Sequence, residues 1–426
     1  MTEIKVKGVN KYGYKETKLG LIPKDWEERS LESIVSEINL GGNYSNDQEN
    51  EGLPLIKMGN LSRGKINLDK VEYVSVEDEI NEKDILKYGD LLFNTRNSLD
   101  LVGKVAVWRS ELEIALYNSN LLKISFDSTH VYSSFYMNYL FNSFRVLMRL
   151  RAIATGTTSV AAIYNKDVMR LKLPLPPKEE QKVIVEILSK WDEVISKTEK
   201  LIKAKKRYKK GLMQRLLSGR VRFPEFEGED WVEVKLGEVF DRVTEKNETE
   251  LVKNVLTISA QDGLVSQTDY YNKSVASKDL SNYIVLNRGE FAYNKSYSEG
   301  YPLGAIKRLD DYEKGVLSPL YICFKLTSEK VDSDFITHFF EFGGLDHGIY
   351  KIAREGARNH GLLNVSVKEF FEIDLILPQQ EEQKKIASVL NEAMKEIELL
   401  EEQLEKYQMQ KKGLMQKLLT GKVRVN

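Results

Sequence analysis

Two long stretches of the chain carry apolar side chains at alternating intervals of four and three residues, a spacing typical of a helix face that packs on a partner helix. Polar residues fill most positions between them, so each stretch predicts one long amphipathic helix. At about 40 residues, each helix spans about 60 Å. The seam positions are Ile184, Leu188, Trp191, Ile195, Ile202, Leu212 and Leu216, then Ile386, Leu390, Ile397, Leu400, Leu404, Leu414 and Leu418.

Proline and glycine mark the ends of both predicted helices. Pro176 and Pro177 precede the first and Pro378 precedes the second, where proline starts a helix rather than breaking it. Gly219 and Gly421 follow the last seam positions and predict the stops.

The two helical segments are copies of each other. Residues 175–222 align without a gap on residues 377–424, with 21 identities in 48 positions. Weaker similarity continues outside this block, where Trp26 matches Trp231 and Gly89 matches Gly289. The chain therefore consists of two copies of one repeated unit.

Each apolar seam needs a partner, and the nearest candidate is the other helix of the same chain. The run Lys197–Lys210 has eight Lys or Arg residues and one Glu, whereas the second helix carries Glu396, Glu398, Glu401, Glu402 and Glu405. This complementarity favours an intramolecular pair without fixing its direction. The alternatives are helices that pair with another protein, and a basic run that follows a phosphate backbone or is simply solvated.

The regions outside the helices predict α/β-type globular units. Apolar runs such as LPLIKM, KVAVWR and LLKISF in the first unit, and VLTIS, YIVLN and LYICFKL in the second, are typical of strands. One helical stretch is expected in each unit, over residues 133–150 and 334–342, with its aromatic residues in the core. The fold class is α+β, divided into residues 1–25 (an N-terminal extension), 26–173 (first domain), 174–222 (first helix), 223–375 (second domain) and 376–426 (second helix and tail).

Composition adds mainly exclusions. A net charge of −1 in 426 residues indicates no particular partner. One cysteine, Cys323, fits a reducing compartment, and neither a signal peptide nor an apolar run of membrane-spanning length is present. We expect a soluble, cytoplasmic protein.

Motifs for catalysis are incomplete. Residues 59–65 have P-loop spacing, but Ile66 stands where the magnesium-binding hydroxyl belongs. Glu225, Glu233 and Lys235 resemble a nuclease array, although the first copy lacks it and chance explains it better. The four histidines lack metal-ligand spacing. We predict no catalytic residue, no metal and no cofactor in this chain.

The repeated segments resemble a known family. LPLPPKEEQKVI at residues 173–184, LPQQEEQKKI at 377–386, the GLMQ-x-LL-x-G-x-VR endings and the I-P-x-x-W opening at 22–26 are similar to type I restriction-modification specificity (S) subunits. The order of domain, helix, domain, helix matches that family over essentially the whole chain.

The resemblance implies two target-recognition domains that each bind half of a bipartite DNA site, spaced by an antiparallel coiled coil. It also implies two methyltransferase (M) subunits that use S-adenosylmethionine, and two endonuclease/translocase (R) subunits that use ATP and Mg²⁺. The rival hypothesis is a coiled-coil scaffold with repeated peptide-binding domains and no DNA contact.

Candidate DNA contacts are polar residues on loops that occupy matching places in the two units. One pair of loops follows Gly89 and Gly289, a second precedes the helices, and a third lies earlier in each unit. The candidates are Asn94, Arg96, Asn97, Ser98, Thr157, Thr158, Ser159, Asn60 and Arg63 in the first unit, and Asn294, Lys295, Ser296, Tyr297, Arg354, Arg358, Asn359, His360 and Gln261 in the second.

Overall fold

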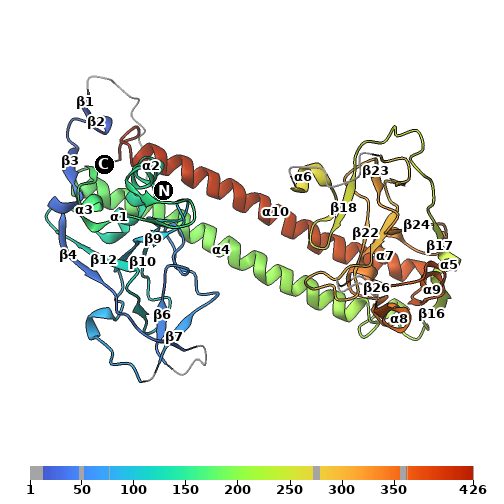
Figure 1. Ribbon diagram of the computed structural model, residues 1–426. Helices are drawn as coiled ribbons and strands as arrows, with labels where there is room; N and C mark the ends of the chain where they lie inside the picture. Colours follow the sequence, from blue (N-terminus) through green and yellow to red (C-terminus); the bar gives the residue numbers. More distant parts are fainter. Residues whose placement is uncertain are drawn as a thin grey trace. The chain divides into compact units, whose positions relative to one another are not determined.

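The computed structural model describes residues 13–425, apart from 48–51, 76, 272–278, 356–360 and 362. The chain divides into two compact units, each built from one β-rich region and parts of both long helices (Figure 1). Unit 1 comprises residues 1–199 and 403–426, and unit 2 comprises residues 200–402. The α+β class predicted from the sequence is confirmed.

The long helices are α4 (Lys178–Leu216) and α10 (Gln380–Leu418), of 39 residues each. Both begin just after the predicted prolines. Gly219 and Gly421 each follow at a φ of 69°, the left-handed conformation that glycine adopts readily at a helix stop. The predicted boundaries are therefore confirmed.

The helices run antiparallel within each unit. In unit 1, Trp191 packs edge-on against Tyr407, and the Asp192 carboxylate pairs with Lys411 at 2.5 Å. In unit 2, Lys205 pairs with Glu396 and Lys206 with Glu401, both at 2.7 Å. Part of the basic run thus meets the acidic helix, and the prediction of an intramolecular pair is confirmed.

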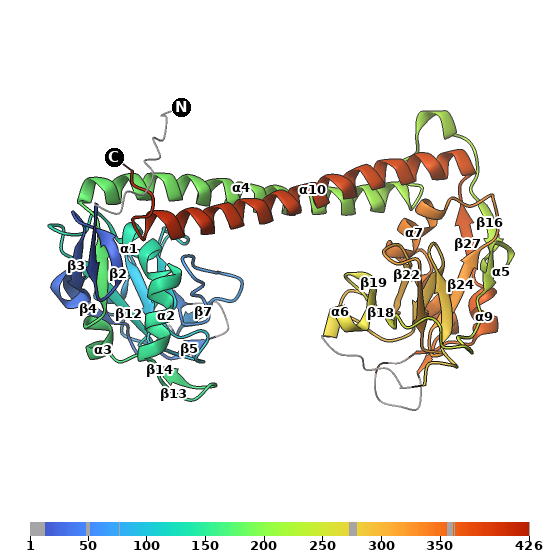
Figure 2. The same ribbon diagram turned by 90° about the horizontal axis from the view of Figure 1, so that it is seen from above.

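None of the predicted seam residues is exposed, but the ends of the seam have a second function. Ile184, Leu188 and Leu418 belong to the main core of unit 1, and Leu216, Ile386 and Leu390 to that of unit 2. Figure 2 shows both helices lying along one side of each β-rich region. Each domain therefore closes its core on the helix pair.

Unit 1 is built around a four-stranded antiparallel sheet of order β10-β8-β12-β4 and a second sheet of order β11-β6-β7-β5. Its strands are β1 (Tyr14–Thr17), β2 (Gly20–Pro23), β3 (Glu27–Ser30), β4 (Val35–Leu40), β5 (Asn46–Asp47), β6 (Pro54–Ile56), β7 (Glu72–Val74), β8 (Leu91–Asn94), β9 (Arg96–Asn97), β10 (Val105–Val107), β11 (Leu116–Tyr117), β12 (Leu121–Phe126), β13 (Thr155–Gly156), β14 (Ala161–Ala162) and β15 (Lys172–Leu175).

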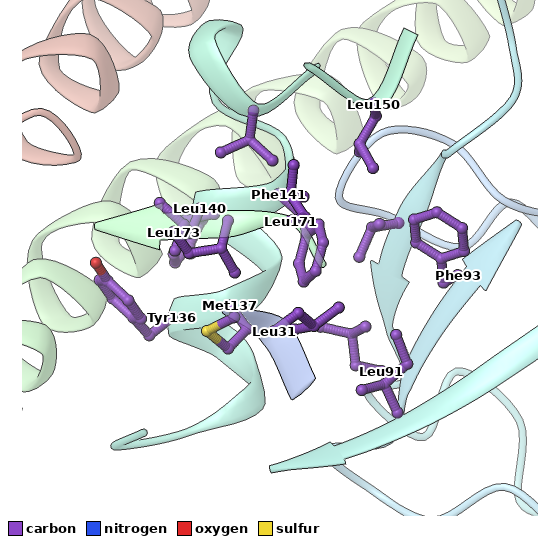
Figure 3. Packing of buried hydrophobic residues seen from close by; sticks show 14 of the residues in the cluster. Leu31, Leu91, Phe93, Tyr136, Met137, Leu140, Phe141, Leu150, Leu171 and Leu173 are labelled. Carbon is purple, nitrogen blue, oxygen red and sulfur yellow. The ribbon is translucent and has the colours of Figure 1, made fainter. Parts of the chain in front are cut away.

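Helices α1 (Ser134–Phe141), α2 (Phe144–Ile153) and α3 (Asn165–Met169) complete unit 1. Figure 3 shows Tyr136, Met137, Leu140 and Phe141 of α1 packed among strand residues such as Leu91 and Phe93. The prediction of one helix over residues 133–150 was wrong. The chain breaks at Asn142 and Ser143, because the Asn142 amide and the Ser143 hydroxyl both donate to carbonyls of α1 and Ser143 starts a second helix.

Unit 2 repeats the main sheet in the equivalent order β22-β21-β24-β17. Its strands are β16 (Val232–Lys235), β17 (Phe240–Arg242), β18 (Leu256–Ser259), β19 (Gly263–Ser266), β20 (Ile284–Asn287), β21 (Phe291–Asn294), β22 (Ala305–Arg308), β23 (Lys314–Leu317), β24 (Ile322–Leu326), β25 (Arg354–Glu355), β26 (Leu363–Asn364) and β27 (Asp374–Leu377). Its short helices are α5 (Leu236–Val239), α6 (Gln267–Tyr271), α7 (Ser333–Glu341), α8 (Asp346–Ile352) and α9 (Val367–Phe371).

In both units the strand after the tryptophan pairs with the strand that leads into a long helix. Strand β3 pairs antiparallel with β15, and β16 pairs antiparallel with β27. Each domain is therefore tied to its helix at its first and last strands. Trp26 is fully buried, whereas Trp231 is only half-buried.

Candidate DNA-contacting surfaces and helix joints

Two of the predicted polar loops in unit 1 join in one small sheet. Strand β9, which holds Arg96 and Asn97, pairs with β14, and β14 pairs with β13. Farther along, the Leu99 amide donates to the Thr158 carbonyl at 3.0 Å. The β13–β14 hairpin projects from the domain in Figure 2. Loops about 60 residues apart in the sequence thus form one surface.

Unit 2 brings the equivalent loops together in the same way. The Leu363 amide of β26 donates to the Lys295 carbonyl at 3.0 Å, and the Tyr297 amide donates to the Gly361 carbonyl at 2.9 Å. The backbone of Arg354 lies in β25, which pairs with β26. The candidates Arg358, Asn359 and His360 lie outside the described residues.

The third pair of predicted loops approaches the same surfaces. In unit 1, Arg63 Nη2 donates to the Asp100 carbonyl at 3.0 Å, just beyond the β9 segment. In unit 2, Gln261 Nε2 donates to the Glu299 carbonyl at 3.5 Å, just beyond residues 295–297. Each unit therefore assembles three polar loops at one place on an equivalent frame.

The individual side chains differ in how free they are. Arg96, Thr157, Thr158, Ser159, Gln261 and Tyr297 are exposed, and Arg63, Asn97, Ser98, Asn294, Lys295 and Ser296 are partly exposed. Asn60 and Asn94 are buried. Asn60 accepts from the Lys57 amide and donates to the Asn67 and Lys70 carbonyls, so its side chain holds its own loop. We therefore correct Asn60 and Asn94 to structural positions.

Asn94 and Asn294 share a local role. The side-chain oxygen of each accepts from the backbone amide two residues later, at Arg96 and Ser296, and both contacts are 3.0 Å long. Asparagine commonly forms such a turn with its own backbone. These residues set the direction of the loop, and the residues after them supply its exposed side chains.

A buried ion pair closes unit 1 where the chain's C-terminal tail meets α4. Glu180 is 5% exposed and accepts from Arg424 Nε and Nη2, both at 2.8 Å, and from Trp26 Nε1 at 2.9 Å. Arg424 also pairs with Asp25. These carboxylates raise the pKa of Arg424, and the bond from Arg424 lowers the pKa of Asp25. One guanidinium thus ties together α10's tail, the start of α4 and the entry to the first domain.

Unit 2 has the equivalent joint with the helices exchanged. Glu382 at the start of α10 is buried and accepts from Arg222 Nε at 2.9 Å and Nη2 at 2.6 Å. Arg222 follows α4. Unlike Trp26, Trp231 Nε1 is buried without a hydrogen-bond partner among the described residues. In both units, therefore, the glutamate near the start of one repeat bonds with the arginine that ends the other repeat: Glu180 with Arg424, and Glu382 with Arg222.

A second repeated residue connects each helix to the loop before α1 or α7. The Gln181 side chain accepts from the Tyr132 amide and donates to the His130 and Pro176 carbonyls. Gln383 makes the matching bonds to Asp332, Lys330 and Pro378. The sequence contained the signal for these joints, an identical EEQK and G-x-VR in both copies, but not the pairing between copies.

Comparisons with known proteins agree with this arrangement. A family model described as the type I restriction modification DNA specificity domain matches residues 23–206. The chain is 29% identical to the putative type I restriction enzyme MjaX specificity subunit of Methanocaldococcus jannaschii, over 97% of both chains. It is 28% identical to the MjaVIII specificity subunit of the same organism, over 95% of this chain and 94% of that one. Over nearly its whole length the chain is therefore similar to type I restriction-modification specificity subunits.

Solved structures share the fold of this chain at low sequence identity. An S subunit of a type I system from M. genitalium matches 92% of this chain and 96% of its own, with a TM-score of 0.54 and 15% identity. A chain from a structure titled for complex assembly and conformational transition of the type I R-M system matches 94% and 99%, with a TM-score of 0.50 and 14% identity.

The residues that resembled a nuclease array form ion pairs with other residues of the fold. Glu225 forms an ion pair with Lys385 of α10, and Lys235 forms one with Glu372. Within the described ranges, no cluster of three or more His, Cys, Asp or Glu could hold a metal ion, and no helix is long and apolar enough to cross a membrane.

Proposed function

We propose that this chain is a specificity subunit whose two domains each contact one half of a bipartite, gapped DNA site, and that the helix pair sets the gap. The observation that carries the proposal is the convergence of three polar loops at equivalent places in both units. The loops differ in sequence between units while the frame is shared. Two different half-sites would require this combination, because side chains specify bases and the frame positions them.

The helix lengths support a spacer function. Each of α4 and α10 contributes residues to both units without interruption, and a helix of 39 residues rises about 58 Å. Two domains held by such a pair would contact DNA at separated sites on the duplex. The exchanged Glu–Arg joints hold the two helices in one register, as a spacer of fixed length requires.

The catalytic steps belong to partner subunits in this proposal. Two methyltransferase subunits would use S-adenosylmethionine to methylate adenine, and two endonuclease/translocase subunits would use ATP and Mg²⁺. The repeated helix surfaces offer equivalent docking places for two copies of the same partner. A repeat conserved within one chain, beside domains that differ, fits a common partner on both sides.

A methylome comparison tests the proposal. Genomic DNA from cells with and without this chain, in the presence of the methyltransferase subunits, is sequenced for modified adenine. We expect a bipartite, asymmetric motif that appears only when the chain is present. A continuous motif, or the same motif without the chain, would contradict the proposal.

A further inference from the structure

The loop surface of unit 1 carries a group of cations around Asp100. Arg63 donates Nη2 to the Asp100 carbonyl, while its Nη1 is buried and has no hydrogen-bond partner among the described residues. Arg151 Nη2 lies 3.6 Å from the Asp100 carboxylate, whose side chain is 82% exposed. The acid beside these two guanidinium groups is therefore largely in water and balances them weakly.

Lys104 belongs to the same group. It directly precedes β10, and its carbonyl accepts from the Asn94 amide at 2.8 Å, which places it beside the first polar loop. Burial, followed by the charge of Arg63, lowers the pKa of Lys104. Burial and the charge of Arg151 similarly lower the pKa of Arg63. No acid of the described residues acts on the pKa of Lys104 beside burial and the charge of Arg63. The three cations repel one another and lack sufficient counter-charge.

Unit 2 has uncharged residues at the matching places. Gly103 and Gly304 both adopt positive φ before equivalent strands, so Lys104 corresponds to Ala305, which is buried. Arg151 lies two residues before the end of α2, where α8 has Tyr350. Gln261 makes the contact equivalent to that of Arg63.

A cation near this part of unit 2 already has its counter-charge. The nearby Lys307 pairs with Glu341 at 2.5 Å. The combination of Arg63, Lys104 and Arg151 thus has no equivalent in unit 2, where Lys206, Lys209 and Lys210 line the cavity beside Gln261.

Two members of the group, Arg63 and Arg151, are open to a ligand. Arg63 and Arg151 line a cavity of about 530 Å³, and Lys65 and Lys412 line it too. Of these, Lys65 contacts Glu199 at 3.5 Å. An oxyanion placed here would lie beside the guanidinium groups of Arg63 and Arg151 and would reduce the repulsion between them.

We propose that Arg63 and Arg151 bind a phosphate of the DNA backbone beside the half-site of unit 1, and that Lys104 adds its positive charge to this site. Arg63 then contacts the phosphate backbone and positions the domain, and it does not read a base. The two domains therefore bind phosphate with different strength. The inference rests on the proposed function and adds a site to it. Base contacts need separate side chains at separate edges, whereas three cations around one acceptor suit a single phosphate.

The test uses the full chain in complex with its methyltransferase subunits. The variants are Arg63→Ala, Lys104→Ala and Arg151→Ala, with Arg63→Lys to retain the charge and Gln261→Ala as the matched control in unit 2. Dissociation constants are measured over a salt series on the methylated motif's duplex and on a duplex with the unit 1 half-site scrambled.

Because the cations share one phosphate, we expect each alanine variant in unit 1 to lower the slope of log affinity against log salt by at most about 0.9, and to weaken both duplexes by the same factor. Arg63→Lys should retain the wild-type slope, and so should Gln261→Ala, which removes no positive charge whatever its effect on affinity. Loss confined to the intact half-site with an unchanged slope would overturn the inference, as would unchanged binding of all variants. If the wild-type complex itself shows no sequence preference, the proposed function fails instead, and the inference with it.

Discussion

The two buried Glu–Arg joints predict that removing either arginine destabilises the protein, and that the two losses of stability differ. Arg424→Ala leaves Glu180 buried without its guanidinium, and Arg222→Ala does the same to Glu382. Removing one partner of a buried ion pair commonly costs about 3–5 kcal/mol, because the other charge stays desolvated. Both sites have the same geometry, so the difference between them depends on the remaining donors.

The remaining donors favour unit 1. After Arg424→Ala, Trp26 Nε1 still donates to Glu180, whereas Trp231 Nε1 makes no such bond to Glu382. The Arg424 side chain is also 30% exposed, against 16% for Arg222, so solvent screens its pair more. We expect a loss of about 2–3 kcal/mol for Arg424→Ala and about 3–4 kcal/mol for Arg222→Ala, since a bond to a charged group contributes about 1.5–3 kcal/mol.

Native-state hydrogen exchange measures each joint separately. The opening free energy of amides at the start of α4 should fall in Arg424→Ala, and that at the start of α10 in Arg222→Ala. Arg→Lys at either site should recover only part of the loss, because lysine lacks the bidentate fork. Arg220→Ala, an exposed neighbour, is the control. Losses below about 0.5 kcal/mol at both joints, or a larger loss at Arg424, would refute this reasoning.

Three further predictions follow from single contacts. Trp26→Phe should cost about 1–2 kcal/mol more in stability than Trp231→Phe, because only the former breaks a bond to a buried carboxylate; equal losses in urea unfolding would contradict it. Burial lowers the pKa of His338, which also contacts Asn391 and faces Asp334, Arg308 and Lys209. Its native pKa lies below its unfolded value near 6.5, so the stability of unit 2 should fall as pH drops through that value towards the native pKa, and His338→Gln should flatten this part of the stability profile. Arg96→Ala should reduce methylation of sites with the unit 1 half-site; a loss of binding that ignores half-site sequence would make Arg96 a phosphate contact instead.

The helices were predictable because their signals are local and repeated. Seam spacing, the prolines before Lys178 and Gln380, and glycine at 219 and 421 together specify start, face and stop. Their antiparallel direction was not predictable from charge, since Lys205 could meet an acidic residue in either orientation. Direction follows from long-range packing, in which the seam ends enter the cores of the domains.

The sequence predicted which loops form the candidate surface, but it did not predict which residues of those loops have free side chains. The loops after β8 and β21 and the loops before the long helices do meet, as their matching positions in the two copies indicated. Asn60 and Asn94 were misassigned because a polar side chain that closes its own turn has the same composition as one that faces solvent. Lys104 and Arg151 were missed because one lies before a strand and the other on a helix, outside any polar run.

Shortening the spacer tests the central claim most directly. Residues 197–203 of α4 and 399–405 of α10, one heptad at equivalent positions, are deleted together so that the seam keeps its period. Seven residues rise about 10.5 Å, and DNA rises about 3.4 Å per base pair. The methylome of cells with this variant should show both half-sites unchanged and a gap shorter by about 3 base pairs. Altered half-sites with an unchanged gap would contradict the account.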